Sequence, residues 1–346
     1  MKDRVLVTGA QGFLGRYLVV HLLASDPQTE VLGVGRSVLM PDTFTHAVSC
    51  GDRTIRAPLL GHLKTDDRDR YRYLALNIQQ KTEIRETLHT FRPNVIVHLA
   101  SSLRGCSADE YLQTIMGGTV ALIEAIAESG LNIEKLVMGS TGGVYGAPAD
   151  EELPLNETSA CNPVDFYGVS KLAAEHASRV LCKQYDIPMV VARIFNLVGA
   201  GQQEIHICGR LATQIAAIIS GALPPLIRVG SLAATRDFID VRDAAVGLEL
   251  IARKGSPGEA YNLGTGQETA ISAVLATFLS IAGLSQVPIE RVEELRPTVL
   301  RHFATIEKLR SLGFQPAYDF RQSAEGLLHY YVHDVAHTAF KMTKEN

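Results

Sequence analysis

The chain has 346 residues, of which 46% are hydrophobic and 20% are charged, and its formal net charge is -4 at pH 7. This composition fits a globular protein with a large core, and it excludes both a disordered chain and the basic excess of a nucleic-acid-binding protein. No apolar run reaches the roughly 18 to 20 residues of a membrane span, and the first residues lead into a short strand rather than a signal peptide. We therefore expect a cytoplasmic protein without a nucleic-acid or membrane partner.

The cysteines and histidines do not form a metal-binding or disulfide pattern. Five cysteines, at 50, 106, 161, 182 and 208, are scattered along the chain without a CxxC pair. Such spacing disfavours a disulfide framework or a zinc site. Histidines such as His98, His206 and His302 are also too far apart to suggest ligands. We predict five free thiols and no metal.

Short apolar runs alternate with longer segments of helical period, which predicts βα units and a parallel sheet. Strands are expected at 5–7, 31–35, 73–76, 95–99, 136–139, 189–195 and 260–263. Helices are expected at 12–24, 81–90, 109–128, 166–185, 206–220, 242–253 and 271–281. Residues 38–72 show no clear pattern and are expected to form an insertion loop of unknown purpose.

The predicted fold class is α/β, a Rossmann-like doubly wound parallel sheet with a smaller C-terminal substrate lobe. The dinucleotide-binding domain is expected over residues 1–195, with late strands contributed by about 232–265. Residues 196–346 are expected to form mainly the substrate-binding lobe.

The first strand runs into the sequence VLVTGAQGFLG, residues 5–15, which holds three glycines at the start of a helical period. Gly9 allows a tight turn, Gly12 allows the backbone to approach a pyrophosphate, and Gly15 allows the helix to pack close to the strand. The helix N-terminus supplies unpaired N–H donors for the phosphates. The expected cofactor contacts in this turn are Gly9, Gln11, Gly12, Phe13, Leu14 and Gly15.

The end of the second strand decides between the two nicotinamide cofactors, because an acidic residue there binds the ribose 2'-hydroxyl of NAD(H). Here Arg36 and Ser37 occupy the position, and they suit the 2'-phosphate of NADP(H). NADP(H) is therefore favoured, and NAD(H) stays possible. Further cofactor contacts are expected after the third and fourth strands, from Asn77, Ile78, Leu99, Ala100 and Ser101.

Tyr167 and Lys171 stand four residues apart at the start of a predicted helix, so both side chains lie on one helical face. A nearby ammonium lowers a tyrosine pKa from about 10 and makes the phenol a usable general acid or base. Ser140 and Thr141 end the preceding strand, at the sheet edge where ligands bind. Thr141, Tyr167 and Lys171 are the predicted catalytic residues; Tyr167 and Lys171 also contact the cofactor, and Ser140 contacts the substrate.

Together, the glycine turn, the Ser140–Thr141 strand end and the Tyr167-x-x-x-Lys171 pair resemble the extended short-chain dehydrogenase/reductase family, also described as NAD-dependent epimerases/dehydratases. The resemblance continues through RIFNLVGAGQ at 193–202, RDFIDVRD at 236–243 and the Arg296-Pro297 pair. It implies an enzyme that acts on a nucleotide-activated sugar. It also implies substrate contacts from Asn196, Arg236 and Arg296, and a homodimer.

Within this family the chain looks most like GDP-4-keto-6-deoxy-D-mannose reductases. Dehydratases of the family carry a carboxylate directly after the catalytic threonine, whereas Gly142 and Gly143 stand there in this chain. The resemblance therefore favours an NADPH-linked 4-keto reductase, with a 4-epimerase holding NAD tightly as the alternative. A 4,6-dehydratase and a non-catalytic cofactor-binding protein are the less favoured readings. One departure from the family is the stretch 115–119, Ile-Met-Gly-Gly-Thr, which lacks the asparagine that usually precedes the Gly-Thr pair.

Overall fold

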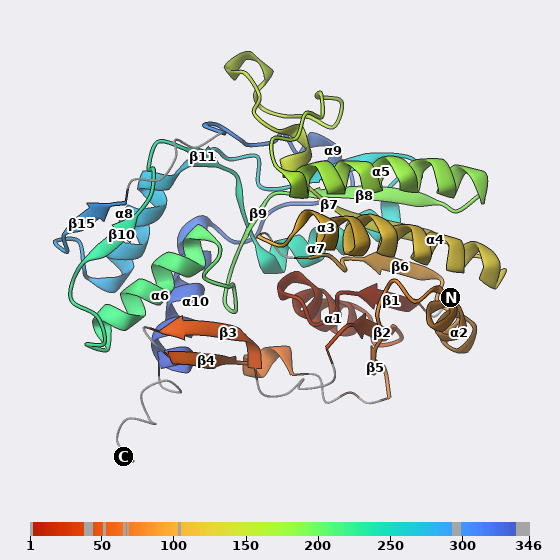
Figure 1. The fold of residues 1–346 in the computed structure, drawn as a ribbon, viewed down its shortest axis with the longest axis horizontal. Coiled ribbons are helices and arrows are strands. Elements are labelled where there is room, and N and C mark those ends of the chain that lie inside the picture. Colours follow the sequence, from red (N-terminus) through yellow and green to blue (C-terminus); the bar gives the residue numbers. More distant parts are fainter. Residues whose placement is uncertain are drawn as a thin grey trace.

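A seven-stranded parallel sheet forms the centre of the larger half of the molecule in the computed structural model, which describes residues 3–37, 44–50, 53–64, 67, 69–102, 105–292 and 299–336 (Figure 1). The strand order is β13-β8-β7-β6-β1-β2-β5. The strands are β1 Arg4–Thr8, β2 Glu30–Gly35, β5 Tyr71–Ala75, β6 Val95–His98, β7 Lys135–Thr141, β8 Met189–Ile194 and β13 Ala260–Leu263. The order reverses at β1, so the C-terminal ends of β1 and β6 flank the crevice where such sheets bind ligands. The predicted doubly wound sheet is confirmed.

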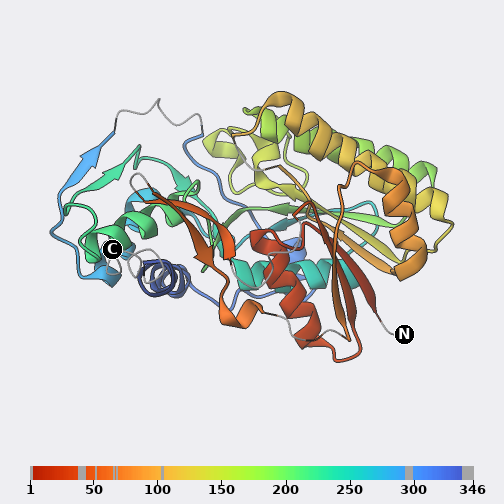
Figure 2. The ribbon, with the colours of Figure 1, turned by 60° about the horizontal axis from the view of Figure 1, so that its bottom comes forward.

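Helices cover both faces of this sheet (Figure 2). One face carries α1 Phe13–Ser25 and α7 Val241–Lys254, and the other carries α2 Lys81–Phe91, α4 Gly118–Ser129 and α5 Phe166–Gln184. The residues of β1 pack alternately on the two faces of the sheet. Val5 and Val7 pack toward α1 and α7, while Leu6 packs toward the helices of the opposite face. A strand that is buried on both faces needs apolar residues at every position.

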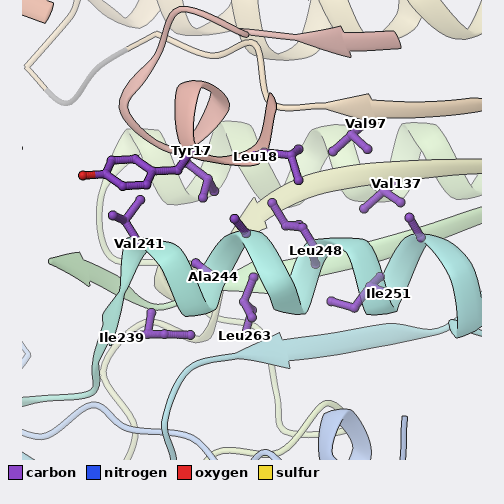
Figure 3. Close-up of a cluster of buried hydrophobic side chains, with 14 of the residues drawn as sticks. Tyr17, Leu18, Val97, Val137, Ile239, Val241, Ala244, Leu248, Ile251 and Leu263 are labelled. Carbon is purple, nitrogen blue, oxygen red and sulfur yellow. The ribbon is translucent and has the colours of Figure 1, made fainter. Parts of the chain in front are cut away.

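The core beneath α7 joins both helices of its face to the sheet. Leu248 of α7 packs in one buried cluster with Leu18 of α1 and with Val97 and Val137 of the sheet (Figure 3). Tyr17 extends its hydroxyl out of this cluster and donates it to the carbonyl of Ala200, at 2.8 Å. The same core therefore anchors the loop that leaves the sheet after β8.

The segment predicted as one helix over 109–128 has three parts. It consists of α3 Ala108–Tyr111, a π-helical turn η2 over Leu112–Gly117, and α4. A π turn holds one extra residue without ending the helix, so the apolar period on either side does not reveal it. Such turns occur frequently at functional sites.

The smaller lobe packs beside the C-terminal edge of the sheet (Figure 1). It contains α6 Ile207–Ile219, α8 Ile271–Ala282 and α10 Phe320–His329, which share one buried core with the π-helical turn η5 Tyr330–Val335. Two short strands, β9 Asn196–Val198 and β12 Phe238–Asp240, pair in parallel. Four further short strands are β10 Ile227–Val229, β11 Thr235–Arg236, β14 Thr269–Ala270 and β15 Ile289–Arg291. Outside the lobe, the 3-10 turns η3 Gly142–Tyr145 and η4 Asp150–Glu152 follow β7, and the short helix α9 Glu307–Arg310 packs beside β13.

The insertion expected to be an unpatterned loop contains a β-hairpin, which corrects the prediction for the middle of 38–72. Strands β3 Phe44–Cys50 and β4 Arg53–Pro58 pair antiparallel, and the 3-10 turn η1 Gly61–Leu63 follows. The hairpin packs on the lobe, where Val48 and Ala57 are fully buried and the hydroxyl of Tyr330 donates to the Pro58 carbonyl at 2.8 Å. Polar residues between these few apolar positions hid the strands. None of the helices in the described part of the chain has the length and hydrophobicity to cross a lipid bilayer.

Candidate active site

A cavity of about 770 Å³ lies at the C-terminal ends of β1, β2, β6, β7 and β8, and its wall continues into the lobe. This is the edge at which open α/β sheets bind ligands, and the volume is typical of a small-molecule site. The predicted site residues that line it are Gly9, Gln11, Gly12, Phe13, Leu14, Gly15, Arg36, Ser37, Ile78, Leu99, Ala100, Ser101, Ser140, Thr141, Tyr167, Lys171, Asn196 and Arg236.

The glycine turn has the shape that a pyrophosphate requires. Gly9 has a φ of +74°, and a side chain there would meet the backbone nitrogen of Ala100 at 2.8 Å. A side chain at Gly15 would lie 2.1 Å from the carbonyl oxygen of Gly9. Helix α1 begins at Phe13 without a side-chain cap, so the N–H groups of its first turn are open to an anion at the cavity wall. The residues present therefore fit a bound dinucleotide.

The end of β2 forms a cationic corner of the cavity. Arg36 and Ser37 line it, as does Arg16, whose Nε donates to the carbonyl of Gln11 at 2.9 Å. The hydroxyl of Tyr73 donates to the Ser37 carbonyl at 2.8 Å, and burial raises the pKa of Tyr73 to about 12 against the opposing charge of Arg16. Arg16 was not predicted, although its position directly after Gly15 is a signal that could have indicated it.

Asn77 makes a local contact instead of joining the described cavity lining. Its Oδ1 accepts a hydrogen bond from the backbone nitrogen of Gln79 at 3.2 Å, just before α2. The neighbouring Ile78 is buried and lines the cavity. Of the two residues predicted to contact the cofactor after β5, Ile78 therefore reaches the cavity and Asn77 does not.

The three predicted catalytic residues line the same cavity. Lys171 is buried, and its Nζ donates to the carbonyl of Gly139 at 3.0 Å and lies 6.0 Å from the ring centroid of Tyr167. Burial lowers the pKa of Lys171 to about 8, and the carboxylate of Glu175 opposes this shift. The Oγ1 of Thr141 accepts from the backbone nitrogen of Gly143 at 3.1 Å. Its hydroxyl hydrogen is not used by that bond and is left for a ligand.

Ser140 lies at the wall but makes an internal contact. Its hydroxyl donates to Glu175, whose carboxylate is also paired with Arg193 at 2.9 Å. Both residues of this ion pair are buried, and Arg193 also donates to the hydroxyl of Tyr145 at 3.1 Å. The proton of Ser140, predicted as a substrate contact, is therefore not available to a substrate oxygen.

His98 is buried at the end of β6 and holds β1 and α4 together beside the cavity. Its Nδ1 contacts the hydroxyl of Thr8 at 2.7 Å, and its Nε2 contacts the hydroxyl of Thr119 at 3.0 Å. Burial and the charge of Lys171 lower the pKa of His98 to about 3. This histidine is therefore neutral, and it connects β1 to α4 through two hydrogen bonds rather than transferring a proton.

The lobe contributes two of the predicted substrate residues. The Nδ2 of Asn196 donates to the carbonyl of Asp237 at 3.1 Å, and the guanidinium of Arg236 donates to the carbonyls of Thr235 at 2.7 Å and Val299 at 3.0 Å. Both side chains are thereby fixed at the wall. Arg296 lies outside the described residues.

Several lining residues were not predicted. Ser102 follows the predicted Ser101, and Gln202 ends the stretch that resembles the family, so both had a signal in the sequence. His46 comes from the hairpin and had none. Other unpredicted lining residues include Thr114, His206 and His302. Among the described lining residues Asp165 is the one carboxylate, and it caps α5 by accepting from the backbone nitrogen of Gly168 at 2.7 Å.

Comparison with known proteins identifies the family of the chain. The NAD dependent epimerase/dehydratase family matches residues 5–264, which is more than half of the chain. The chain belongs to this family. The resemblance drawn from the sequence is thereby confirmed, and the protein is an enzyme of the nicotinamide-dependent type that the family comprises.

The relatives that are similar to this chain in sequence are named for three different reactions. A GDP-6-deoxy-D-mannose reductase of Pseudomonas aeruginosa is 28% identical over 342 residues, 95% of this chain and 97% of the relative. A probable dTDP-glucose 4,6-dehydratase of Sinorhizobium fredii is 32% identical over 75% of this chain and 71% of the relative. UDP-glucose 4-epimerase 4 of Oryza sativa is 30% identical over 81% of this chain and 76% of the relative.

Solved structures share the fold. The dTDP-glucose 4,6-dehydratase of Bacillus anthracis, in complex with NAD, has a TM-score of 0.79 at 23% identity and covers 95% of this chain and 96% of its own. RMD of Pseudomonas aeruginosa, complexed with NADPH, has a TM-score of 0.75 at 24% identity and covers 95% and 99%. At these identities the likeness concerns the fold alone.

Proposed function

We propose that this protein is an NADPH-linked reductase that converts the 4-keto group of a nucleotide-bound deoxysugar into a hydroxyl. The three curated relatives are named for GDP-, dTDP- and UDP-linked sugars, which supports a nucleotide sugar as the substrate class. Of these three, the relative that is covered most fully over both chains is named a reductase. The observation that carries the choice of reaction is the charge of the cavity wall.

The wall favours NADPH over NADH. Arg16, Arg36 and Ser37 surround the end of β2, and no carboxylate stands there among the described lining residues. Guanidinium groups bind a phosphate by charge-assisted hydrogen bonds, whereas a ribose 2'-hydroxyl is usually bound by an acid. A cofactor with a 2'-phosphate therefore fits this corner.

The same wall supports reduction rather than dehydration. A dinucleotide held by the glycine turn and the end of β2 would supply the hydride for the carbonyl carbon. Tyr167 donates the proton that the carbonyl oxygen needs, Lys171 stabilises the phenolate that remains, and the free hydroxyl hydrogen of Thr141 binds the same oxygen. Loss of water would need a second acid/base near the sugar, but Asp165, the one carboxylate among the described lining residues, caps a helix.

We also propose that the enzyme is a homodimer, with α5 in the interface. Three large apolar side chains on this helix, Phe166, Val169 and Val180, are 42%, 44% and 65% exposed. Leu112 of η2 is 48% exposed. Val169 and Val180 are eleven residues apart, which places them on one side of the helix. Light scattering on the native protein and on Val180→Asp tests this: the substitution should convert a dimer into a monomer.

The experiment for the reaction has two parts. Nucleotides released on denaturation of the native protein are identified by mass spectrometry, and consumption of NADPH is then followed with GDP-4-keto-6-deoxymannose and with its dTDP-linked counterpart. A reductase consumes one NADPH per sugar reduced. Retained NAD with no net consumption, together with interconversion of 4-hydroxyl sugars, would instead establish the epimerase.

A further inference from the structure

Gln202 is a buried amide on the cavity wall with an unused acceptor. It is 3% exposed and lines the cavity, and its Oε1 has no hydrogen-bond partner among the described residues. The other end of the amide is satisfied, since its Nε2 donates to the carbonyl of Leu197 at 2.5 Å. A buried polar atom without a partner is costly, so such an atom at a cavity wall indicates a ligand contact.

The backbone of Gln202 is held in place by the lobe. Its carbonyl accepts a hydrogen bond from the hydroxyl of Tyr331 at 2.7 Å, and its nitrogen donates to the carbonyl of Gly199 at 3.2 Å. Tyr331 belongs to η5 and is 1% exposed. The backbone of Gln202 is therefore held by an element almost 130 residues later in the chain, while the side-chain amide is oriented by its bond to Leu197.

The hairpin of the insertion supports the same contact. His46 of β3 is buried, lines the cavity and places its Nε2 3.2 Å from the hydroxyl of Tyr331. Because the hydroxyl hydrogen of Tyr331 is donated to Gln202, the tyrosine oxygen can only accept from the histidine, whose Nε2 also lies 3.7 Å from a carboxylate oxygen of Glu204. Burial lowers the pKa of His46 to about 4, so the ring is neutral at pH 7 and has one hydrogen to give.

We infer that the amide oxygen of Gln202 accepts a hydrogen bond from a hydroxyl of the sugar nucleotide, and that His46 and Tyr331 position it. This inference rests on the proposed function. An acceptor repels a diphosphate oxygen, which carries no proton at neutral pH, so the contact is to a donor group of the ligand such as a hydroxyl. Gln202 lies on the segment that starts at Asn196, and it is anchored to the lobe rather than to the strands of the cofactor half. A sugar hydroxyl is therefore favoured over the cofactor.

The test compares the binding of GDP-mannose, GDP and NADPH to the wild-type protein and to Gln202→Met by calorimetry. Methionine keeps the length of the side chain and removes the acceptor. The dissociation constant for GDP-mannose should rise about three- to tenfold, and those for GDP and NADPH should stay unchanged. Tyr331→Phe should weaken GDP-mannose in the same selective way, and it provides the test if Gln202→Met does not fold. Gln184→Met, at the exposed end of α5, is the matched control.

Each other outcome contradicts the inference in a distinct way. Equal weakening of GDP and GDP-mannose would place the contact on the nucleotide rather than on the sugar, and weakening of NADPH would place it on the cofactor. Unchanged binding of all three by both variants would remove the contact altogether. If the wild-type protein bound none of GDP-mannose, UDP-glucose and dTDP-glucose, the proposed function itself would fail and the inference with it.

Discussion

Two neighbouring hydroxyls at the end of β7 have different environments. Ser140 donates to the buried Glu175, whereas Thr141 accepts from Gly143 and keeps its hydrogen for a ligand. Both were predicted as site residues, because adjacent hydroxyls at a strand end look alike in a sequence. Only the packing of α5 against β7, which brings Glu175 to one of them, separates their roles.

Substitution of each hydroxyl should therefore have a different effect. Thr141→Ala should lower kcat about 10- to 1000-fold while leaving stability nearly unchanged, because it removes a bond to the reacting oxygen. Ser140→Ala should lower the free energy of unfolding by about 1 to 3 kcal/mol, because it removes a partner of a buried carboxylate. Steady-state kinetics and urea unfolding measure the two effects. The reverse pattern would contradict this assignment.

Lys171 gives the reaction a defined pH dependence. Burial lowers its pKa to about 8, and Tyr167, Glu175 and His98 are the titratable groups that face it. Its ammonium is present below that pKa and is lost as the pH rises through it, so kcat should fall above pH 8. Glu175→Gln removes the charge that opposes the shift and should move this fall to lower pH. A profile that stays flat to pH 9.5, or a shift to higher pH in the variant, would contradict the role of Lys171.

Arg36 should determine the choice of cofactor. Arg36→Ala should raise the KM for NADPH about 10- to 100-fold and leave the KM for NADH nearly unchanged, because only NADPH carries the 2'-phosphate. Initial rates with each cofactor measure this, and the exposed Arg321→Ala serves as the control. Equal effects on both cofactors would show that Arg36 does not bind the phosphate.

At the level of elements, the sequence was most informative where burial is symmetric. The inner strands of the sheet are short apolar runs and α7 carries a clear helical period, so β1, α1, α2, α5 and α7 were predicted at nearly their true bounds. The edge strand β5 holds Arg72 and is partly exposed, and the helix predicted over 109–128 has three parts. The hairpin was missed because only Val48 and Ala57, among its apolar residues whose side chains are described, are buried against the lobe. Their partners lie near the other end of the chain, so no local pattern reveals them.

The α7 core predicts a large cost for a single truncation. Leu248 is fully buried between α1 and the sheet (Figure 3), so Leu248→Ala should lower the free energy of unfolding by about 2 to 5 kcal/mol. Leu250→Ala, on the same helix but partly exposed, should cost clearly less. Chemical unfolding of both variants checks this, and similar costs would show that α7 is not packed as described.

At the scale of the whole molecule, the cavity lies between the sheet and the smaller lobe, and its lining residues on the sheet side were easier to predict from the sequence than those on the lobe side. Much of the cavity lining on the sheet side was predictable, because the glycine turn, the end of β2 and the Tyr167–Lys171 pair are local patterns, although Arg16 was missed and Asn77 lies outside the described lining. The lining on the lobe side depends on contacts between distant segments, such as His46 with Tyr331 and Tyr331 with Gln202. Those contacts exist only after the insertion hairpin and the C-terminal turn have packed on the lobe.

Transfer of deuterium from NADPH to the sugar tests the central claim most directly. NADPH labelled with deuterium at the transferred position of the nicotinamide is mixed with a GDP-linked 4-keto-6-deoxy sugar, and the product is analysed by mass spectrometry and NMR. We predict one deuterium at sugar C4 with the wild-type protein, and a rate lowered about 100- to 10,000-fold with Tyr167→Phe. A product without deuterium, or an undiminished rate in the variant, would contradict the account.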